Sequence, residues 1–360
     1  MKIGILTFHC AVNYGAVLQT YGLCQCLQRM GHEVYVIDYR PDFLIEPYKT
    51  FFPQNYKGKS WVVAIRKFVR ELFAFFIRRK RNQLFSQFIH NNLHLDHLNL
   101  AAPDNSYDLF MFGSDQIWNK KITNFDPIFW GQAPAFEYKR MVAYAASAGS
   151  VKNIDKEDLE MIGNYLSRFS SISVREQQLA NFLNEKFYKS CPAVLDPVLL
   201  AGRETFSKIA KDIHHAKPYL LCFSLSDNAE QRELAKKIAA KRGLDFIVMV
   251  SMTEYVSERQ IIQNASVEEF IGLFKSADYV VTSSFHGTVF SILFAKEFIA
   301  FCNKDANAER IDNLLSDLGL KARLCSSYTD LQDKIDWNNV RRLLSEKQAD
   351  SMAFLRKALA

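Results

Sequence analysis

The stretch YVVTSSFHGTVFSILF, residues 279–294, decides which fold we expect for this chain. Its first residues are aromatic and β-branched, which is typical of the end of a short buried strand. Residues 282–287 are small or polar and predict a tight turn, and from Thr288 the apolar pattern through Ala295 predicts a buried helix. A strand, a turn and a helix make half of a βαβ unit. We therefore expect an open α/β sheet with a ligand at this turn.

The same turn contains the main candidate catalytic residue, His286. The start of a helix offers unpaired backbone N–H groups and the positive end of the helix dipole, which together suit an anion. A titratable imidazole beside an anion can transfer a proton or stabilise charge. The alternative, a histidine that only satisfies local backbone groups, stays open. The residues expected to contact the anion here are Ser283, Ser284, Gly287 and Thr288.

Length and composition indicate a two-domain globular protein. The chain has 360 residues, more than one hydrophobic core usually organises, with 49% hydrophobic and 23% charged residues. The net charge of +6 suits anionic small substrates or an anionic membrane surface, and it is too diffuse to indicate nucleic acid. The cysteines lack Cys-x-x-Cys pairs and zinc spacing, so we expect reduced, buried thiols and no metal. Because the chain opens on a strand and has no run as long as a membrane span, we expect a cytoplasmic protein, and a place at the inner face of the membrane stays open.

The first forty residues predict a βαβ unit of a parallel, doubly wound sheet. Residues 2–8 and 32–39 are expected to be strands, and residues 16–30 a helix that ends at a glycine. The first loop lacks Gly-x-Gly-x-x-Gly, so it is not a standard dinucleotide site. Asn13, Tyr14 and Gly15 lie where such a loop would meet a ligand. A simple turn with a helix cap is the alternative.

A basic and aromatic segment, residues 61–93, predicts a helical insert in the first domain. Arginines and lysines alternate with phenylalanines along residues 61–89, as one helix or two. Such a helix can lie on an anionic bilayer or contact a lipid-linked substrate. The alternative, which is the commoner arrangement, packs the aromatic side on the first domain and leaves the charges in water.

Polar residues follow three further predicted strands of the first half. They are Gly113, Ser114, Asp115 and Gln116 after residues 107–112, Ser147 after residues 141–146, and Arg175 after residues 171–174. Strand ends of this kind are where polar substrate contacts are expected, although Ser114 or Asp115 could instead cap a following helix. An arginine there suits bidentate capture of a carboxylate or phosphate, and a structural pair with Glu176 or Asp196 is the alternative.

The second half repeats the strand and helix pattern. Strands are expected there at residues 218–224, 244–250 and 298–302, and helices at 228–242, 266–275, 310–318 and from 337 onward, while the first half ends with a helix at 155–169 and a short strand at 191–195. We place the first domain at residues 1–200, the second at 201–335, and a helix at 336–360 that packs back on the first domain. Asp196 and Pro197 break a strand and mark the boundary. Lys304 and Arg310 follow a strand as further cations.

These motifs, taken in order and spacing, resemble the polysaccharide pyruvyl transferase family over nearly the whole chain. The residues that carry the resemblance are KIGILTFH (2–9), NYGAVLQ (13–19), GSDQIWN (113–119), YAAS (144–147), SVRE (173–176), LDP (195–197) and SFHGT (284–288). Arg175 matches the arginine of a strand-end motif of the family, and His286 matches the histidine of an Arg-x-His motif. Ser284 stands where several members carry that arginine, so one donor contact is either lost or supplied elsewhere, for example by Lys304 or Arg310.

The resemblance implies an α/β fold of two Rossmann-like domains that face a cleft, as in glycosyltransferases of the GT-B type. It also implies transfer of a pyruvyl group from phosphoenolpyruvate to two hydroxyls of a sugar, giving a ketal on a surface polysaccharide or its lipid-linked precursor. Phosphoenolpyruvate would be a co-substrate, and no cofactor or metal would be needed. The first domain would bind the acceptor and the second the donor. The oligomeric state is not predicted.

The resemblance also assigns roles to the candidate residues. Arg175 would hold one anion of the donor, the helix start at Gly287 and Thr288 the other, and His286 would protonate the methylene carbon or assist the leaving phosphate. Asp115 would orient or deprotonate a hydroxyl. The acceptor contacts would come from Asn13, Tyr14, Gly113, Ser114, Gln116 and Ser147. Two alternatives are a nucleotide-sugar glycosyltransferase of the same fold type and a non-catalytic carbohydrate-binding relative.

Overall fold

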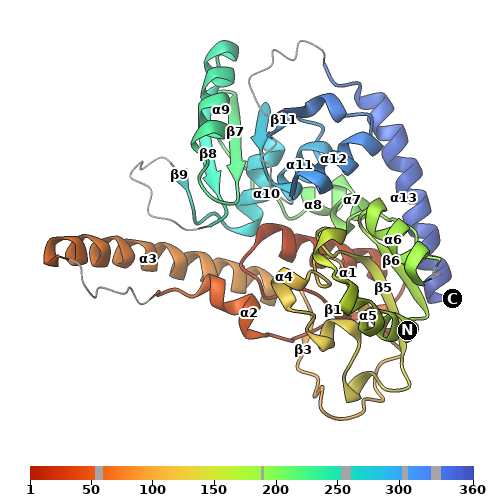
Figure 1. Cartoon of the computed structure of the whole chain (residues 1–360). Coiled ribbons are helices and arrows are strands. Elements are labelled where there is room, and N and C mark those ends of the chain that lie inside the picture. The colour runs from red at the N-terminus through yellow and green to blue at the C-terminus, as the bar shows by residue number, and fades with distance from the viewer. Residues whose placement is uncertain (53–59, 188–189, 253–260, 302–306, 326–333) are drawn as a thin grey trace.

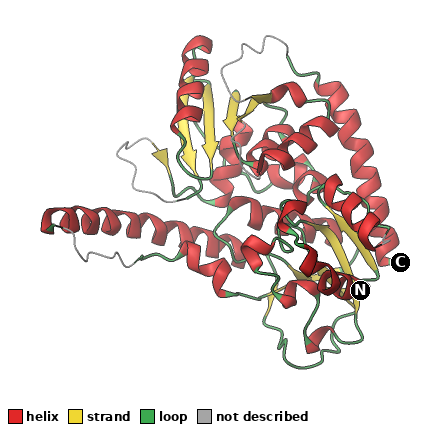
Figure 2. Cartoon of the chain, in the orientation of Figure 1, coloured by secondary structure: helices red, strands yellow, loops and turns green. Residues whose placement is uncertain are grey.

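The structure is a computed structural model that describes residues 1–52, 60–187, 190–252, 261–301, 307–325 and 334–360. In these residues the chain forms two six-stranded sheets, and every strand pair in both is parallel (Figure 1). Helices flank the sheets (Figure 2). The predicted α/β fold of two Rossmann-like domains is therefore confirmed.

The first sheet has the strand order β3-β2-β1-β4-β5-β6. Its strands are β1 (Lys2–Leu6), β2 (Glu33–Ile37), β3 (Leu95–Asp96), β4 (Leu109–Phe112), β5 (Arg140–Ala146) and β6 (Ser171–Val174). The order reverses between β1 and β4, which lie side by side. In an open α/β sheet this reversal leaves a crevice at the carboxyl ends of the strands, where ligands bind.

The second sheet repeats this arrangement with the order β12-β11-β10-β7-β8-β9. Its strands are β7 (Tyr219–Ser224), β8 (Asp245–Val250), β9 (Ile261–Ile262), β10 (Tyr279–Thr282), β11 (Glu297–Phe301) and β12 (Leu324–Cys325). Here the reversal lies between β7 and β10. Residues 279–294 contain β10 and the turn and helix that follow it, so this turn lies at the reversal point of the second sheet.

Several helices of the two domains begin at a residue whose side chain caps the helix. The helices of the first domain are α1 (Tyr14–Arg29), α2 (Asp42–Ile45), α4 (Lys120–Thr123), α5 (Leu159–Ser167) and α6 (Gln177–Phe187). Those of the second domain are α8 (Arg203–Ser207), α9 (Ala229–Arg242), α10 (Val267–Ser276), α11 (Phe285–Leu293) and α12 (Asn307–Asp317). The helices among them with such a cap are α1, α4, α9, α10 and α11. Ser266 and Glu269 form a capping box that fixes the start of α10.

Two helices tie the domains together. The short α7 (Pro197–Ala201) follows Asp196, and the C-terminal α13 (Trp337–Leu359) runs back from the second domain along the first (Figure 1). Ser351 of α13 accepts a hydrogen bond from the backbone N–H of Leu195 at 3.0 Å. Near the end of α13 the Ala358 carbonyl accepts one from Arg140 of β5 at 2.8 Å. The last helix is thus anchored on the first domain.

The basic segment forms one long helix, α3 (Trp61–Asn92), which projects from the body like an arm (Figure 1). Its inner half packs on the body through Phe85, Phe88 and Ile89, which are buried. In the outer half, Phe68, Phe73 and Phe76 are each more than half exposed. The alternative in which the aromatic side packs on the first domain is therefore wrong for the outer half. None of the helices within the described ranges is long and apolar enough to cross a membrane.

Two further boundaries differ from the sequence expectation. The predicted strand at 191–195 is a single bridge between Val174 and Ala193, because Pro192 has no N–H to extend the ladder. The predicted helix at 155–169 is shorter, with a 3₁₀ turn at Lys156–Asp158 before α5.

Candidate active site

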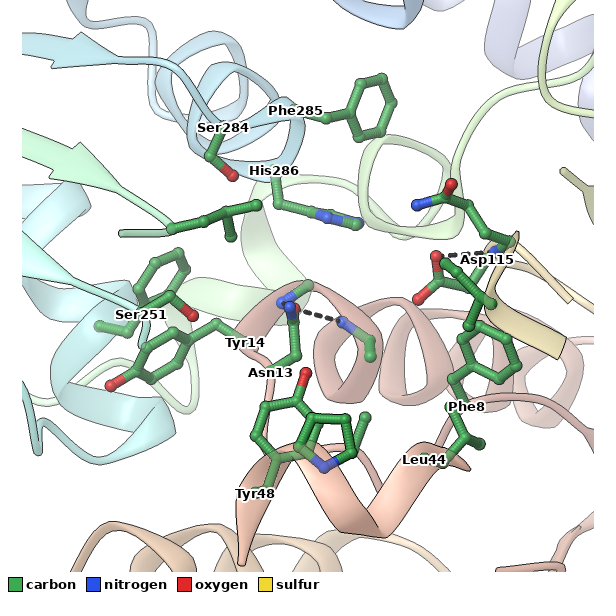
Figure 3. A pocket seen from close by; sticks show the side chains of 18 of the residues that line it. Phe8, Asn13, Tyr14, Leu44, Tyr48, Asp115, Ser251, Ser284, Phe285 and His286 are labelled. Atoms are coloured by element: carbon green, nitrogen blue, oxygen red, sulfur yellow. Dashed lines mark hydrogen bonds between the residues drawn. The ribbon is translucent and has the colours of Figure 1, made fainter. Parts of the chain in front are cut away.

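A cavity of about 190 Å³ lies between the carboxyl edges of the two sheets (Figure 3). The first domain contributes residues that follow β1, including Asn13 and Gly15, and residues that follow β4, namely Asp115 and Gln116. The second domain contributes residues after β8 and β10 and one residue of α12: Ser251, Ser284, Phe285, His286 and Arg310. Both reversal points of the fold therefore open into one cavity.

His286 enters this cavity from the first turn of α11, which begins at Phe285 rather than at Thr288 as predicted. The boundary differs because Ser284 is the N-cap: its side chain accepts a hydrogen bond from the N–H of Gly287 at 3.4 Å, and its carbonyl accepts one from the N–H of Thr288 at 3.0 Å. The predicted anion contact through Gly287 and Thr288 is corrected accordingly, since both amides already have partners.

Gly15 of α1 packs directly against the ring of His286 from the other side of the cavity. A methyl group on Gly15 would overlap Nδ1 of His286. The backbone at Gly15 is helical, so its requirement for glycine comes from this close approach and not from its φ angle. The first domain thereby fixes the position of the histidine that the second domain supplies.

Asp196 lies beside the second ring nitrogen of His286. Its Oδ2 is 3.5 Å from Nε2 of His286, a distance suited to an ion pair but long for a hydrogen bond. Burial raises the pKa of Asp196, but the nearby His286 and Arg175 and the hydrogen bond from the N–H of Val198 outweigh it and bring the pKa down to about 2. Asp196 is thus ionised at neutral pH, where it can orient the imidazole and compensate a positive charge on it.

Arg175 is buried among three carboxylates. Its Nη1 donates to Asp196 at 2.9 Å, its Nε lies 3.4 Å from Glu176, and its Nη2 lies 3.8 Å from Asp115. Burial lowers the pKa of Arg175, but the three acids outweigh it and raise the pKa above its ordinary value. The alternative left open by the sequence is therefore found: Arg175 forms ion pairs with both Glu176 and Asp196. Arg175 lines a neighbouring cavity rather than the one that His286 enters.

Phe285 borders both of these cavities, and the guanidinium groups of Arg175 and Arg310 both lie near its ring. The Cζ atoms of Arg175 and Arg310 lie 4.9 Å and 5.4 Å from the ring centroid. Burial and the charge of Arg175 lower the pKa of Arg310 to about 10, so Arg310 remains a cation at neutral pH. Arg310 therefore brings positive charge to the cavity of His286.

Four of the residues predicted to contact the acceptor line the cavity, namely Asn13, Tyr14, Asp115 and Gln116. Asn13 is the N-cap of α1 and accepts a hydrogen bond from the N–H of Gly15 at 2.9 Å, as the alternative interpretation proposed. Tyr14 stacks on Phe270 and is fully buried.

The other predicted residues lie elsewhere. Ser114 and Ser147 are fully buried, Ser147 donates to Glu176 at 2.6 Å, and neither they nor Gly113 border the cavity. Ser283 is half-buried, and Lys304 lies outside the described residues. Of the thiols predicted to be buried, Cys325 is partly exposed and Cys302 lies outside the described residues. The others are buried and form no disulfide: Cys10, Cys24, Cys26, Cys191 and Cys222.

Sequence reasoning missed how three residues contribute to the site. Gly15 was expected to meet a ligand together with Asn13 and Tyr14, but its contact with His286 was not foreseen, and Phe285 lay within a quoted motif without an assigned role. Asp196 was interpreted as a domain boundary. The available signal for Asp196 was its position before a proline, because an aspartate there commonly caps a helix and so has a fixed side chain.

Fold and site together define an α/β protein with a cavity between two Rossmann-like domains. A family model described as polysaccharide pyruvyl transferase matches residues 13–305, and the chain belongs to this family. The protein is thus a transferase of the polysaccharide pyruvyl transferase type. No curated protein sequence matches the chain.

Solved structures similar to the chain include the Anabaena protein HepE in complex with UDP and glucose, at 10% identity and a TM-score of 0.48, covering 100% of this chain and 99% of that one. The UDP-GlcNAc 2-epimerase of Methanocaldococcus jannaschii has 10% identity and a TM-score of 0.45, with 96% and 92% covered. The glycosyltransferase SnogD from Streptomyces nogalater has 12% identity and a TM-score of 0.43, with 99% of each chain covered. We draw nothing about substrate from resemblances at this level.

Proposed function

We propose that this protein transfers the pyruvyl group of phosphoenolpyruvate to two hydroxyls of a sugar and forms a ketal in the cavity between the domains. The observation that carries the proposal is the placement of His286, which borders the cavity with Asp196 beside its Nε2 and Gly15 packed against its ring. A histidine with an ionised carboxylate behind it can give up and recover a proton. The family match to residues 13–305 supports the assignment.

The donor is a dianion or trianion, so its site has to supply positive charge. Arg310 supports this, since it borders the cavity and its pKa of about 10 leaves it charged at neutral pH. Within the described residues, no hydrogen bond is formed by the backbone N–H groups of Phe285 and His286 at the start of α11. These two amides take the place of those of Gly287 and Thr288 as the proposed contact for phosphate or carboxylate.

The reaction needs a proton at the methylene carbon first. Nδ1 of His286 gives this proton, and the neighbouring carbon becomes an oxocarbenium-like electrophile while Asp196 compensates the ring's charge before transfer. One sugar hydroxyl adds to that carbon and loses its proton to Asp115. The bond to the phosphate oxygen then breaks, and the second hydroxyl adds and closes the ketal. Of the two hydroxyl protons, one balances the proton now in the methyl group and the other leaves with phosphate.

Ligand-induced stabilisation tests the donor. The purified chain is heated with phosphoenolpyruvate, with UDP-N-acetylglucosamine and with inorganic phosphate, because a ligand at a hundred times its Kd adds about 2.7 kcal/mol to the folded state. We expect phosphoenolpyruvate to raise the melting temperature more than inorganic phosphate does, and Arg310→Gln to reduce that rise. Arg342→Gln, at an exposed position of α13, is the matched control and should not reduce it.

The opposite pattern identifies the main alternative. If UDP-N-acetylglucosamine stabilises the protein and phosphoenolpyruvate does not, the chain is a nucleotide-sugar glycosyltransferase and the proposal is wrong. If inorganic phosphate raises the melting temperature as much as phosphoenolpyruvate does, the cavity does not recognise the carboxylate of the donor.

A further inference from the structure

The outer half of the α3 arm exposes a continuous apolar stripe. Large apolar side chains recur every three or four residues, which places them on one side of the helix: Trp61, Ile65, Phe68, Leu72 and Phe76, with Val62, Val69 and Phe73 beside them. Trp61 is 74% exposed, Phe73 62% and Phe76 58%. A run of neighbouring, exposed, large apolar side chains marks a contact with a partner or a membrane.

The stripe does not face the body of the protein. The buried residues of α3 lie along the opposite side of the helix and begin at Glu71, about a third of the way along it: Glu71, Ala74, Arg81, Phe85, Phe88 and Ile89. The arm is therefore attached by its inner half, and its outer half extends away from both sheets (Figure 1). A helix that only needed to pack on the first domain could start at Glu71, the first of its buried residues, and would not need the residues before it.

The charges next to the stripe have one sign. Glu71 is the only acidic residue in the sequence of α3, and it is buried and paired with Arg78 at 2.6 Å. Arg66, Arg79 and Lys80 are exposed on the same helix. The accessible surface of the arm is therefore apolar and basic, with no exposed carboxylate of its own.

This combination selects one occupant. A second copy of the chain could cover the stripe, but pairing two arms would bring basic residues together with no exposed acid on either helix to balance them. An anionic lipid surface supplies both the apolar layer and the negative headgroups. We propose that the outer half of α3, residues 61–76, lies on an anionic membrane with its apolar stripe among the acyl chains and its basic residues at the headgroups.

The arm would also hold the active-site cavity near that surface. A further cavity, distinct from the two described above, lies at the base of α3 and is lined by Arg78 and Arg81. Pro47 and Tyr48 line both this cavity and the one that His286 enters. The proposed membrane contact and the proposed reaction therefore meet at one end of the arm, although neither depends on the other.

Vesicle flotation of the full chain tests the proposal. We compare phosphatidylcholine vesicles with vesicles that also contain phosphatidylglycerol, and we expect binding only to the second kind. Phe73→Gln combined with Phe76→Gln should weaken this binding about tenfold or more, and Arg66→Gln combined with Arg79→Gln should weaken it and reduce its sensitivity to salt. Tyr138→Gln, at a fully exposed aromatic outside α3, is the control and should bind like the unchanged protein.

All the altered side chains are solvent-exposed and border neither cavity, so the variants should keep the melting temperature of the unchanged chain and its stabilisation by phosphoenolpyruvate. Three results would overturn the membrane proposal. They are equal binding to neutral vesicles, no binding to either kind, and absence of vesicle binding together with a dimer in light scattering that the phenylalanine variant dissociates. The last would assign the stripe to a second copy.

Discussion

His286 is held by residues from three separate parts of the chain. Ser284 caps the helix that carries it, Gly15 leaves room for its ring, and Asp196 lies next to its Nε2. Because each of these contacts constrains a different side of the imidazole, its position is fixed before any ligand enters. Such fixed placement is what proton transfer to a bound substrate requires.

Gly15→Ala should abolish most of the activity without unfolding the protein. The added methyl group would overlap Nδ1 of His286, so the ring has to move or the domains have to separate slightly. General acid–base catalysis contributes roughly 10²–10⁴-fold, and we expect a loss of turnover of that order. Steady-state kinetics and urea unfolding measure the two effects.

A second substitution separates crowding from an unrelated defect. In Gly15→Ala combined with His286→Ala, the overlap is gone, so the loss of stability caused by Gly15→Ala should be largely recovered while activity stays low. If Gly15→Ala costs the same stability with and without the imidazole, the two residues are not coupled and the contact does not position His286.

Asp196→Asn should destabilise the protein at neutral pH and much less in acid. The pKa of the carboxyl falls from 3.8 to about 2 on folding, so the ionised form favours the native state above pH 4 and this contribution disappears as the pH falls toward 2. The shift corresponds to about 2 kcal/mol. Asparagine keeps an oxygen for the N–H of Val198 but puts an NH2 group in front of Nη1 of Arg175, so the change removes the charge together with that hydrogen bond. Urea unfolding at pH 7 and pH 3 measures it, and an equal loss at both values would contradict the account.

Sequence reasoning could find His286 and Arg310 because each follows a predicted strand. It could not find that Gly15 and Asp196 hold His286, since these contacts join distant parts of the chain and depend on how the two domains meet. The same limit applies to Ser147, whose hydroxyl donates to Glu176 instead of reaching the cavity.

At the scale of elements, the start of α11 decides which backbone groups face the cavity. Sequence periodicity placed this start at Thr288, because the apolar run becomes regular only there. The structure starts the helix at Phe285, since Ser284 supplies the N-cap. A hydroxyl side chain just before an apolar residue is a recognised start signal, and giving it more weight would have located the boundary.

Ser284→Ala should lower the free energy of unfolding by about 1 kcal/mol, the usual loss for an N-cap. Ser284→Thr keeps a hydroxyl that can accept from the N–H of Gly287 and should recover most of the loss. Thermal or urea unfolding of the three proteins measures this. Equal destabilisation by alanine and threonine would mean that the hydroxyl does not cap the helix.

The longer strands were predicted closely because parallel strands are buried on both faces and appear as continuous apolar runs, whereas the two-residue strands β3, β9 and β12 were not predicted. Residues 171–174 were predicted as a strand and form one with the same bounds. The direction of α3 was not predictable in this way. Its apolar stripe looks like a core-facing stripe in sequence, and only the fold shows that the outer half of the helix has no core beneath it.

At the scale of the whole molecule, the two domains share a packed apolar junction. Tyr14 at the start of α1 lies parallel to Phe270 of α10 with ring centroids 4.4 Å apart, and its hydroxyl donates to the carbonyl of Ala265 at 2.7 Å. Arg29 at the end of α1 donates to the carbonyl of Ala201 at 3.1 Å. The cavity therefore lies over a junction that fixes both of its walls.

Tyr14→Phe tests this junction. The change keeps the stacked ring but leaves the buried carbonyl of Ala265 without its partner, which should cost about 1–3 kcal/mol of unfolding free energy. Tyr138→Phe, at a fully exposed position, is the control and should cost nothing measurable. A neutral effect of Tyr14→Phe would mean that this hydrogen bond does not hold the domains together.

The central claim is that this transferase makes a pyruvate ketal and uses His286 to do so. Mass spectrometry of the surface glycan from cells that lack the protein, and from the same cells supplied with the unchanged chain, His286→Gln or His90→Gln, tests it most directly. We predict that the ketal is lost without the protein, returns with the unchanged chain and with the exposed control His90→Gln, and does not return with His286→Gln. A ketal that persists without the protein, or that His286→Gln restores in full, would contradict the account.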